Sequence, residues 1–435
     1  MGSNYIEMRL EDCMDAIIDY RGKTPKKVDN GIPLITAKII KNGRIQEVNE
    51  FIAINDYDDW MVRGLPLEGD VVLTTEAPLG EVAQLDARKV ALAQRVITLR
   101  GKKGILEKDY LLYLLQSSFV QNQLNGRASG STVTGIKQSE LREIILRLPP
   151  VSLQKSISHQ LKCLDKKIDL NNQINKTLEQ MSQTLFKSWF VDFDPVIDNA
   201  LDAGNPIPEA LQSRAELRQK VRNSTDFKPL PAEIRSLFPS EFEETELGWV
   251  PEGWETNRLE NILELAYGKA LKKTERIEGD YPVYGSGGVD GSHNEFLVKG
   301  PGIIVGRKGT VGSLYWEDKD FYPIDTVFYV KPKKYFSLVY CYQLLKTLGL
   351  ENMNTDAAVP GLNRNNAYRL DVIIPTQTII AQYTNIVQTF RYKMDSNHNE
   401  IDNLTNLRNT LLPKLISGEL SLEDLPDLTT DTEAA

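Results

Sequence analysis

Basic side chains gather in short, turn-rich stretches of this chain, where they could contact phosphate. In the first half they are Arg21, Lys23, Lys26 and Lys27, followed by Lys38, Lys41 and Arg44 around Asn42-Gly43. In the second half they are Lys269, Lys272, Lys273 and Arg276, followed by Arg307 and Lys308 before Gly309. Clustered cations on loops can bind nucleic-acid phosphates, and arginine or lysine at a groove edge can recognise guanine. We interpret both sets as candidate DNA contacts, with a solvated charged surface as the alternative for each cluster.

Two further cations lie in loops that resemble each other. Lys137 ends the sequence Gly135-Ile136-Lys137, and Arg364 ends Gly361-Leu362-Asn363-Arg364. Because these loops are more alike than the basic clusters, we expect them to maintain structure rather than to select bases. Lys137 and Arg364 could still contact phosphate.

Motifs for catalysis are missing beside these cations. RGKT at 21–24 lacks the glycine five residues before Gly22 that a phosphate-binding loop requires. YGSGGVDG at 284–291 is glycine-rich but lacks the G-x-G-x-x-G spacing of a dinucleotide-binding loop. DFDPV at 192–196 does not match the Asn/Asp-Pro-Pro-aromatic signature of amino-methyltransferases. We therefore expect a non-catalytic protein, although an enzyme with unrecognised acid and base groups is an alternative.

Histidines and cysteines are isolated along the sequence. The histidines are His159, His293 and His398, and the cysteines are Cys13, Cys163 and Cys341. This spacing suggests neither a catalytic triad, nor a zinc site, nor a disulfide framework. We expect no metal or cofactor of the chain's own.

Net charge is −9, yet this deficit lies outside the two stretches that carry the basic clusters. Residues 1–150 hold 20 basic and 20 acidic side chains, and residues 253–375 hold 15 of each, whereas residues 190–252 hold 6 against 13. The two balanced stretches can still segregate cations to one face. Apolar runs stay shorter than the roughly 18 residues of a membrane helix, and Met1–Arg9 has no signal pattern, so we expect a cytoplasmic protein without membrane contact.

A long amphipathic helix must organise the chain around these loops. Between Lys155 and Lys187 apolar residues recur at alternating steps of four and three, with Asn171 and Asn175 as polar exceptions. The apolar positions are Ile157, Leu161, Leu164, Ile168, Leu178 and Leu185. The same pattern returns 226 residues later, where Asn397 corresponds to Asn171. The second set is Tyr383, Val387, Phe390, Met394, Ile401, Leu404 and Leu411.

Each such helix would be about 45–50 Å long and would need a partner along its apolar seam. The other copy is the simplest partner, and a polar asparagine in the seam would fix the register. We expect an antiparallel coiled coil, with a surface helix on a globular domain as the alternative. The second helix should end after Pro413.

The segments before the two helices also repeat. STVTGIKQSELREIILRLPP at 131–150 aligns without a gap to AAVPGLNRNNAYRLDVIIPT at 357–376, again with an offset of 226 residues. Farther upstream, GDVVLTTEAPLGEVAQL resembles GPGIIVGRKGTVGSLYW, which brings Gly80 over Gly312. The chain is therefore expected to hold two copies of one unit, related by a pseudo-twofold axis.

Each unit should have an α+β fold. Short β-branched segments bounded by glycine, proline or aspartate predict strands. They are Ile32–Ile35, Val71–Thr75, Val96–Leu99 and Ile144–Leu148 in the first unit, and Ile303–Val305, Val327–Val330 and Val372–Ile374 in the second. Residues 109–124 and 336–349 have helical spacing. We predict two similar mixed α/β domains, each followed by a long helix.

The boundaries follow from these patterns. We place the first domain at 1–150, its helix at 151–189, the second domain at 253–376 and its helix at 377–418. An acidic crossover rich in proline and aromatic residues, at 190–252, should be ordered but irregular, with a flexible linker as the alternative. An acidic tail at 419–435 should be frayed.

The junctions of this arrangement resemble those of the specificity (S) subunits of type I restriction-modification systems. They are GSTVTGIKQSELREIILRLPPVSLQKSISHQL at 130–161, LFKSWFVDFDPV at 185–196, LPAEIRSLFPSEFEETELGWVPEGW at 230–254 and LRNTLLPKLISGEL at 407–420. The resemblance covers essentially the whole chain. It implies two target-recognition domains that each bind half of a split, asymmetric double-stranded DNA site, with the paired helices setting the separation.

Partners also follow from the resemblance. It implies docking of two methyltransferase (modification) subunits that bring S-adenosylmethionine, and of restriction subunits that use ATP and Mg²⁺. The family supplies no residue code for base recognition, so the candidate DNA contacts rest on charge alone. A self-contained DNA-modifying enzyme and a coiled-coil scaffold without DNA contact are the alternatives.

Overall fold

The computed structural model describes residues 5–22, 24–130, 134–354 and 361–422. Within these residues the chain forms two compact units. The first unit comprises Met1–Asn171 and Asn399–Ala435, and the second comprises Asn172–His398. Each unit therefore contains one mixed α/β domain together with parts of both long helices, α6 (Val151–Phe190) and α12 (Gln377–Ser417).

In the first unit, a four-stranded antiparallel sheet has the order β2-β11-β8-β9. The strands are β2 (Met14–Asp19), β8 (Val71–Thr75), β9 (Leu79–Gln84) and β11 (Val96–Gly101). β8 is β-branched and buried throughout, as the interior of a sheet requires. A second sheet has the order β10-β4-β7-β3, with Leu34 beside Ala91 in a parallel pair. Its strands are β3 (Lys27–Val28), β4 (Ile32–Ile35), β7 (Phe51–Ile52) and β10 (Ala91–Leu92).

The second unit repeats this order. Its antiparallel sheet runs β16-β22-β19-β20, and its smaller sheet runs β18-β17-β21, with Val283 beside Tyr322 in a parallel pair. The strands are β16 (Leu263–Tyr267), β17 (Tyr281–Gly285), β18 (Gly288–His293), β19 (Gly302–Gly306), β20 (Leu314–Glu317), β21 (Tyr322–Pro323) and β22 (Val327–Pro332).

Each domain closes with the same pairing of its first and last strands. β1 (Ile6–Arg9) pairs with β12 (Ile145–Leu148) in the first unit, and β15 (Glu255–Arg258) pairs with β23 (Asp371–Ile374) in the second, both antiparallel. The chain then enters α6 or α12. The predicted fold class, two similar mixed domains each followed by a long helix, is confirmed.

Short helices complete the two domains. The first has α1 (Leu10–Cys13), α2 (Tyr57–Trp60), α3 (Lys108–Gln116), α4 (Ser118–Gly126) and α5 (Gln138–Arg142). It also has a β-hairpin formed by β5 (Ile40–Lys41) and β6 (Arg44–Ile45). The second has α10 (Leu338–Thr347) and α11 (Arg364–Tyr368). The helical segment predicted at 109–124 is broken, because Ser117 ends α3 and its hydroxyl caps α4 by accepting a bond from the Val120 amide at 3.4 Å.

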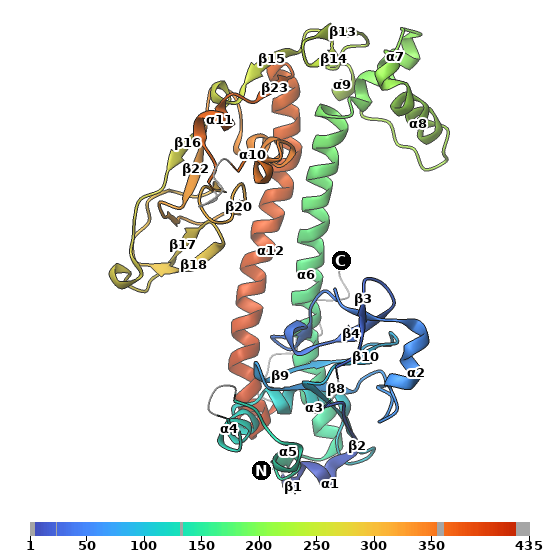
Figure 1. Ribbon diagram of the computed structural model, residues 1–435, viewed down its shortest axis with the longest axis vertical. Helices are drawn as coiled ribbons and strands as arrows, with labels where there is room; N and C mark the ends of the chain where they lie inside the picture. Colours follow the sequence, from blue (N-terminus) through green and yellow to red (C-terminus); the bar gives the residue numbers. More distant parts are fainter. Residues whose placement is uncertain (1–4, 23, 131–133, 355–360, 423–435) are drawn as a thin grey trace. The chain divides into compact units, whose positions relative to one another are not determined.

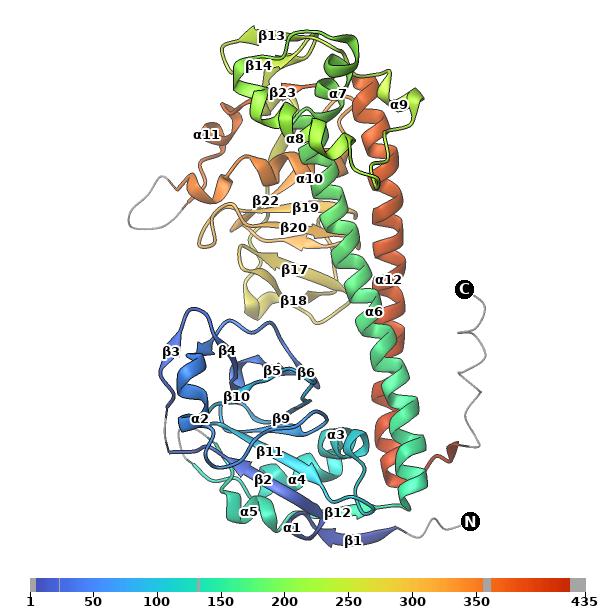
Figure 2. The same cartoon turned by 90° about the vertical axis from the view of Figure 1, so that its right-hand side faces the viewer.

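α6 and α12 pack side by side and antiparallel within each unit (Figures 1 and 2). In the first unit Asp165 meets Arg408 at 2.9 Å, and Asn171 meets Glu400 at 2.9 Å. In the second unit Asn175 meets Asn397 at 2.7 Å, and the Tyr383 hydroxyl donates to the Ser182 carbonyl at 3.2 Å. Residue numbers rise along α6 as they fall along α12, so the predicted antiparallel pairing is confirmed.

The polar seam positions find different partners from those suggested by the repeat. Asn397, the repeat counterpart of Asn171, donates instead to Asn175 across the pair, and Asn175 donates to the Met394 carbonyl at 3.4 Å. Because α12 runs antiparallel to α6, Asn171 lies one turn before this asparagine pair and donates to Glu400.

α12 continues through Pro413 and ends at Ser417, which agrees with the end predicted after Pro413 and with the predicted bounds 377–418. Proline inside a helix removes one backbone hydrogen bond and costs about 3 kcal/mol. On either side of it, Leu411, Leu412, Leu415 and Ile416 are buried in the core of the first unit. Their burial offsets that cost, since each buried leucine or isoleucine contributes about 2 kcal/mol.

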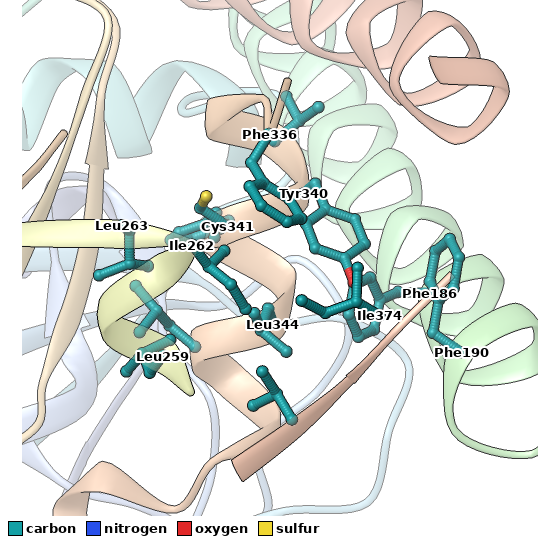
Figure 3. Close-up of a cluster of buried hydrophobic side chains, with 14 of the residues drawn as sticks. Phe186, Phe190, Leu259, Ile262, Leu263, Phe336, Tyr340, Cys341, Leu344 and Ile374 are labelled. Atoms are coloured by element: carbon teal, nitrogen blue, oxygen red, sulfur yellow. The ribbon is translucent and has the colours of Figure 1, made fainter. Parts of the chain in front are cut away.

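Residues 190–252 are ordered, as predicted, but they form helices and strands where an irregular path was expected. The segment contains α7 (Asp194–Ala203), α8 (Gln212–Arg222), α9 (Ala232–Arg235) and the antiparallel pair β13 (Phe242–Thr245) and β14 (Gly248–Pro251). Its aromatic residues Phe193 and Phe238 anchor it to the core of the second unit, where they are buried against Trp254 and Trp189 of the flanking segments. Figure 3 shows Phe186 and Phe190 of α6 against Tyr340 of α10, with ring centroids 5.5 and 5.4 Å from the tyrosine.

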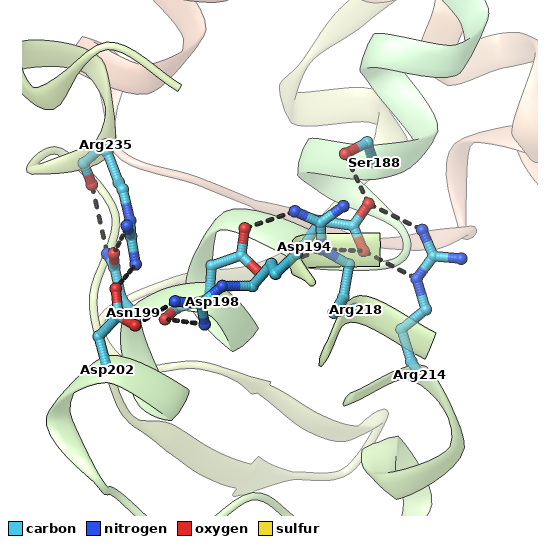
Figure 4. Close-up of polar contacts among 9 residues, drawn as sticks. Ser188, Asp194, Asp198, Asn199, Asp202, Arg214, Arg218 and Arg235 are labelled. Atoms are coloured by element: carbon cyan, nitrogen blue, oxygen red, sulfur yellow. Dashed lines mark hydrogen bonds and ion pairs between the residues drawn. The ribbon is translucent and has the colours of Figure 1, made fainter. Parts of the chain in front are cut away.

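Aspartates on α7 and arginines on α8 hold the two helices together (Figure 4). Arg214 makes two bonds of 2.7 Å to the Asp194 carboxylate. Arg218 binds the Asp198 carboxylate through Nε and Nη2. One turn farther on, Arg222 binds Asp202 through Nη2 alone, and its Nη1 donates to the Asp198 carbonyl at 3.4 Å. Both helices thus present their charges at steps of four, which places them on matching faces.

Glu179 of α6 joins both α10 and α12 in the second unit. Its carboxylate accepts bonds from Lys346, from Gln343 at 3.2 Å and from Arg391 at 2.7 Å. Arg391 in turn lies over the rings of Trp316 and Tyr342, 4.3 and 4.9 Å from their centroids. Burial alone would raise the pKa of Glu179, but Arg391, Gln183 and Lys346 together lower it below its ordinary value of 4.5.

This cluster predicts an acid-sensitive contribution to stability. A carboxylate whose folded pKa is lowered stabilises the fold above its unfolded pKa, and that stability is lost as pH falls through the folded pKa. We expect the free energy of unfolding of the second unit to fall as pH drops below 4.5, and Glu179→Gln to weaken this dependence. Unfolding in urea at a series of pH values measures it. Glu260→Gln, at an exposed carboxylate, is the control, and an equal effect of both substitutions would contradict the assignment.

Candidate nucleic-acid interface

Three of the predicted DNA contacts are engaged within the protein. Arg44 binds Asp165 and Asp169 of α6, at 3.3 and 2.5 Å. Arg21 binds Asp19 at 2.7 Å and donates to the Ile136 carbonyl at 2.9 Å. Arg276 has a side chain only 10% exposed and binds Asp290. Arg44 thus ties the first domain to α6, and Arg21 and Arg276 bind within their own domains. These contacts use charges that the sequence assigned to DNA, and their assignment to DNA stays a prediction.

The remaining predicted cations are mostly exposed. Within the described residues Lys26, Lys38, Lys41 and Lys137 in the first unit, and Lys269 and Lys308 in the second, make no ion pair. Lys27, Lys272 and Lys273 are also exposed but pair with Glu50, Glu275 and Asp290, at 2.7, 3.5 and 2.9 Å. Lys23 lies outside the described residues. Exposed pairs of this kind cost little to open, so these lysines can still reach phosphate.

A loop corner is built in the same way in both domains. In the second domain, the Leu362 amide donates to the Arg307 carbonyl at 2.8 Å, and Lys308 forms a β-bridge with Gly361. In the first, the Ile136 amide donates to the Thr75 carbonyl at 3.0 Å, and Glu76 forms a β-bridge with Gly135. A Cβ atom on Gly135 would lie 3.1 Å from that Thr75 oxygen, so the close approach favours glycine.

Side chains at this corner differ between the domains. The first domain places Thr75 and Glu76 where the second places Arg307 and Lys308, and Glu76 is paired with Arg95 at 2.9 Å. A shared backbone therefore carries different hydrogen-bonding groups, as expected if the two domains select different bases.

The first domain also has a recess beside this corner, of about 290 Å³. Its lining includes Lys27, Lys38, Thr36, Gln94 and Arg95. Gln94 and Arg95 were not identified from the sequence, because they stand apart from any basic cluster and reach the recess only through the fold. The recess presents amide, hydroxyl and cationic donors together, which suits contact with base edges and phosphate.

In the second domain, two arginines at the corresponding corner pack against the ring of an exposed tyrosine. Tyr267 ends β16 and is 48% exposed. The guanidinium carbons of Arg307 and Arg364 lie 4.9 and 4.7 Å from the centroid of its ring. Both arginines were predicted from the sequence but Tyr267 was not, because a single tyrosine at the end of a strand is ordinarily a packing residue.

Other chemistries find no support in the described part of the chain. Among these residues no group of three His, Cys, Asp or Glu side chains could hold a metal ion, and none of their helices is long and apolar enough to cross a membrane. Cys13 and Cys341 are buried free thiols, and burial raises the pKa of Cys13 to about 11, which keeps it unreactive.

Comparisons with known proteins agree with this geometry. The sequence matches the family described as Type I restriction modification DNA specificity domain, over residues 3–180 and 251–406. It is 26% identical to the type I restriction enzyme HindI specificity subunit of Haemophilus influenzae over 379 residues, which cover 77% of this chain and 82% of that one. It is also 26% identical to the MjaIX specificity subunit of Methanocaldococcus jannaschii over 379 residues, covering 82% and 79% of the two chains.

A solved structure shares the fold. It is the crystal structure of the type I restriction-modification S subunit from M. genitalium, with a TM-score of 0.53, 19% identity, and coverage of 95% of this chain and 96% of that one. The chain belongs to the family of type I restriction-modification DNA specificity subunits. It is a non-catalytic component that gives such a complex its DNA sequence specificity.

Proposed function

We propose that this subunit binds a split, asymmetric site in double-stranded DNA, with one half bound by each domain. The observation that carries the proposal is the shared corner: the same backbone bonds present Thr75 and Glu76 in one domain, and Arg307 and Lys308 in the other. Unlike side chains at equivalent places would contact unlike bases. The exposed lysines of both domains would supply the phosphate contacts.

The two long helices are proposed to set the gap between the half-sites. α6 follows the first domain and α12 follows the second, and each pairs with the other inside both units. Successive faces of duplex DNA repeat every 34–36 Å or so, which is within the length of such helices. Inserting equal numbers of helical residues into both would therefore change the gap while leaving the two half-site sequences unchanged.

Partner subunits would supply the chemistry. We propose that two methyltransferase subunits dock on this chain and bring S-adenosylmethionine, and that restriction subunits add ATP and Mg²⁺, so that this chain needs no cofactor of its own. The methyltransferase would flip the target adenine, because a stacked base cannot be modified. Binding to cellular DNA requires the cytoplasmic location that the sequence predicts.

The test is sequence preference in the assembled state. The purified chain with its modification subunits is offered a pool of random duplexes at physiological salt, and the bound fraction is sequenced. We expect enrichment of one two-part sequence, bound at least about 10³-fold more tightly than random duplex. Equal binding of all duplexes would contradict the proposal, and methyl transfer by this chain alone would favour a self-contained enzyme.

A further inference from the structure

We infer that Tyr267, Arg307 and Arg364 form the base-recognition element of the second domain, and that its two arginines recognise guanine in the major groove. The inference rests on the proposed function and assigns a base to one half of the site. Arginine donates two parallel bonds to O6 and N7 of guanine, a pattern that no other base pair presents in that groove.

The two guanidinium groups remain available for a ligand. Arg307 donates one bond inside the protein, from Nη1 to the Asp325 carbonyl at 3.0 Å. Neither it nor Arg364 pairs with a carboxylate in the described residues, and Nε of Arg364 is buried without a hydrogen-bond partner there. Arg44 and Arg276, by contrast, have their charges neutralised by aspartates.

Stacking holds both arginines in place before DNA arrives. Arg307 lies 4.9 Å from the Tyr267 ring centroid and 5.8 Å from that of Phe328, and Arg364 lies 4.7 Å from Tyr267 and 5.6 Å from Tyr368. Tyr267 and Phe328 pack with their centroids 5.0 Å apart. Each guanidinium is thus fixed against a rigid aromatic surface, which reduces the side-chain entropy lost on binding.

The backbone around the arginines is also fixed. The Leu362 amide binds the Arg307 carbonyl at 2.8 Å, which ties the two loops together. The Leu265 amide donates to the Tyr368 hydroxyl at 2.9 Å, which ties α11 to β16. A contact that selects a base needs this precision, because two hydrogen bonds must form in one plane.

Phosphate contact is a weaker explanation of the same geometry. A phosphate requires only positive charge within reach, and exposed Lys269 and Lys308 nearby supply that charge on flexible chains. A fixed guanidinium group can also bind phosphate through two bonds, but only it, and not a lysine, offers the pair of parallel donors that O6 and N7 of guanine accept. The first domain has Thr75 at the place of Arg307 and Asp19 at the strand end that corresponds to Tyr267, so we expect this guanine contact in only one half-site.

The test uses Arg307→Gln and Arg364→Gln in the full chain, assembled with modification subunits. Once the wild-type site is known, duplexes altered at one base pair at a time compete for binding. We expect each variant to lose discrimination at one G·C pair of one half-site, by about ten- to a hundredfold, and to keep it elsewhere. Tyr267→Ala should act in the same direction, and Tyr267→Phe should retain discrimination because it keeps the ring.

Arg258→Gln is the matched control, because Arg258 belongs to the same domain, is 59% exposed and pairs with Glu260 at 3.9 Å. Unchanged thermal unfolding excludes misfolding as the cause. An equal loss of affinity for all duplexes, with a salt dependence reduced by about one counterion, would indicate phosphate contact and overturn the inference. Unchanged discrimination would overturn it as well. Both results leave the proposed function intact, which fails only if the wild-type complex shows no sequence preference.

Discussion

Leu164→Asp is expected to lower the free energy of unfolding of the first unit by about 4 kcal/mol or more. Leu164 lies on α6, is 5% exposed and packs in the core that also contains Leu161, Leu411 and Leu415. The substitution removes a buried leucine, which costs about 2–5 kcal/mol, and leaves an unpaired charge between the helices. Urea unfolding followed by circular dichroism measures the loss.

Leu170→Asp provides the matched control for the helix pair. Leu170 lies on the same helix, but half of its side chain is exposed, so the new carboxylate remains in water. We expect a change of no more than about 0.5 kcal/mol. Equal destabilisation by both substitutions, or none by Leu164→Asp, would contradict the pairing of α6 and α12 in the first unit.

Asp194→Ala is expected to destabilise the second unit by about 3–5 kcal/mol. Its carboxylate is 6% exposed, binds Arg214 through two bonds of 2.7 Å and accepts a further bond of 2.7 Å from the Ser188 hydroxyl. Removing the carboxylate leaves the Ser188 hydroxyl and Nε of Arg214 without their acceptor, and only Asp192, 3.1 Å from Nη2, still pairs with Arg214. Loss of such a buried partner costs more than the pair itself contributes. Thermal and urea unfolding both report this change.

Asp202→Ala distinguishes burial from charge pairing. Asp202 also binds two arginines, Arg222 and Arg235, but its side chain is 48% exposed. Water can replace the lost carboxylate, so we expect a loss of less than about 1 kcal/mol. If the two substitutions were equally costly, the network between α7 and α8 would owe its stability to charge pairing alone.

The apolar spacing of the helices and the internal repeat together predicted most of the fold. The apolar spacing from Ile157 to Ile168 and from Tyr383 to Met394 fixed both helices, since only a partner along the seam can bury so long a stripe. The repeat at 131–150 and 357–376 predicted that both domains would share one architecture. These inferences succeeded because each rests on many residues that agree.

Features decided by tertiary contacts were beyond sequence reasoning. Arg44 looked like part of a basic cluster, yet its partner Asp169 lies 125 residues away in the chain. The aspartates of α7 and the arginines of α8 alternate at matching steps, but charge content alone suggested only an acidic crossover. Pro413 lies inside α12, whose last residues remain helical because buried residues on both sides of the proline pack in the core of the first unit.

The candidate site residues were likewise predicted only in part, because their partners depend on tertiary contacts. Charge counts found Arg307 and Arg364, because they stand beside glycine-rich loops. They could not distinguish these arginines from Arg21 and Arg276, which are neutralised by Asp19 and Asp290. Tyr267 gained its significance only when the strand, the two loops and α11 were placed together.

The most direct test of the central claim is a methylation map of DNA treated with a hybrid complex. Residues 253–376 would be replaced by the second domain of a relative that has a different specificity, with α6 and α12 left unchanged. The account predicts a two-part site in which one half and the gap stay the same while the other half changes. A site changed in both halves, or unchanged in both, would contradict the claim that each domain recognises its own half.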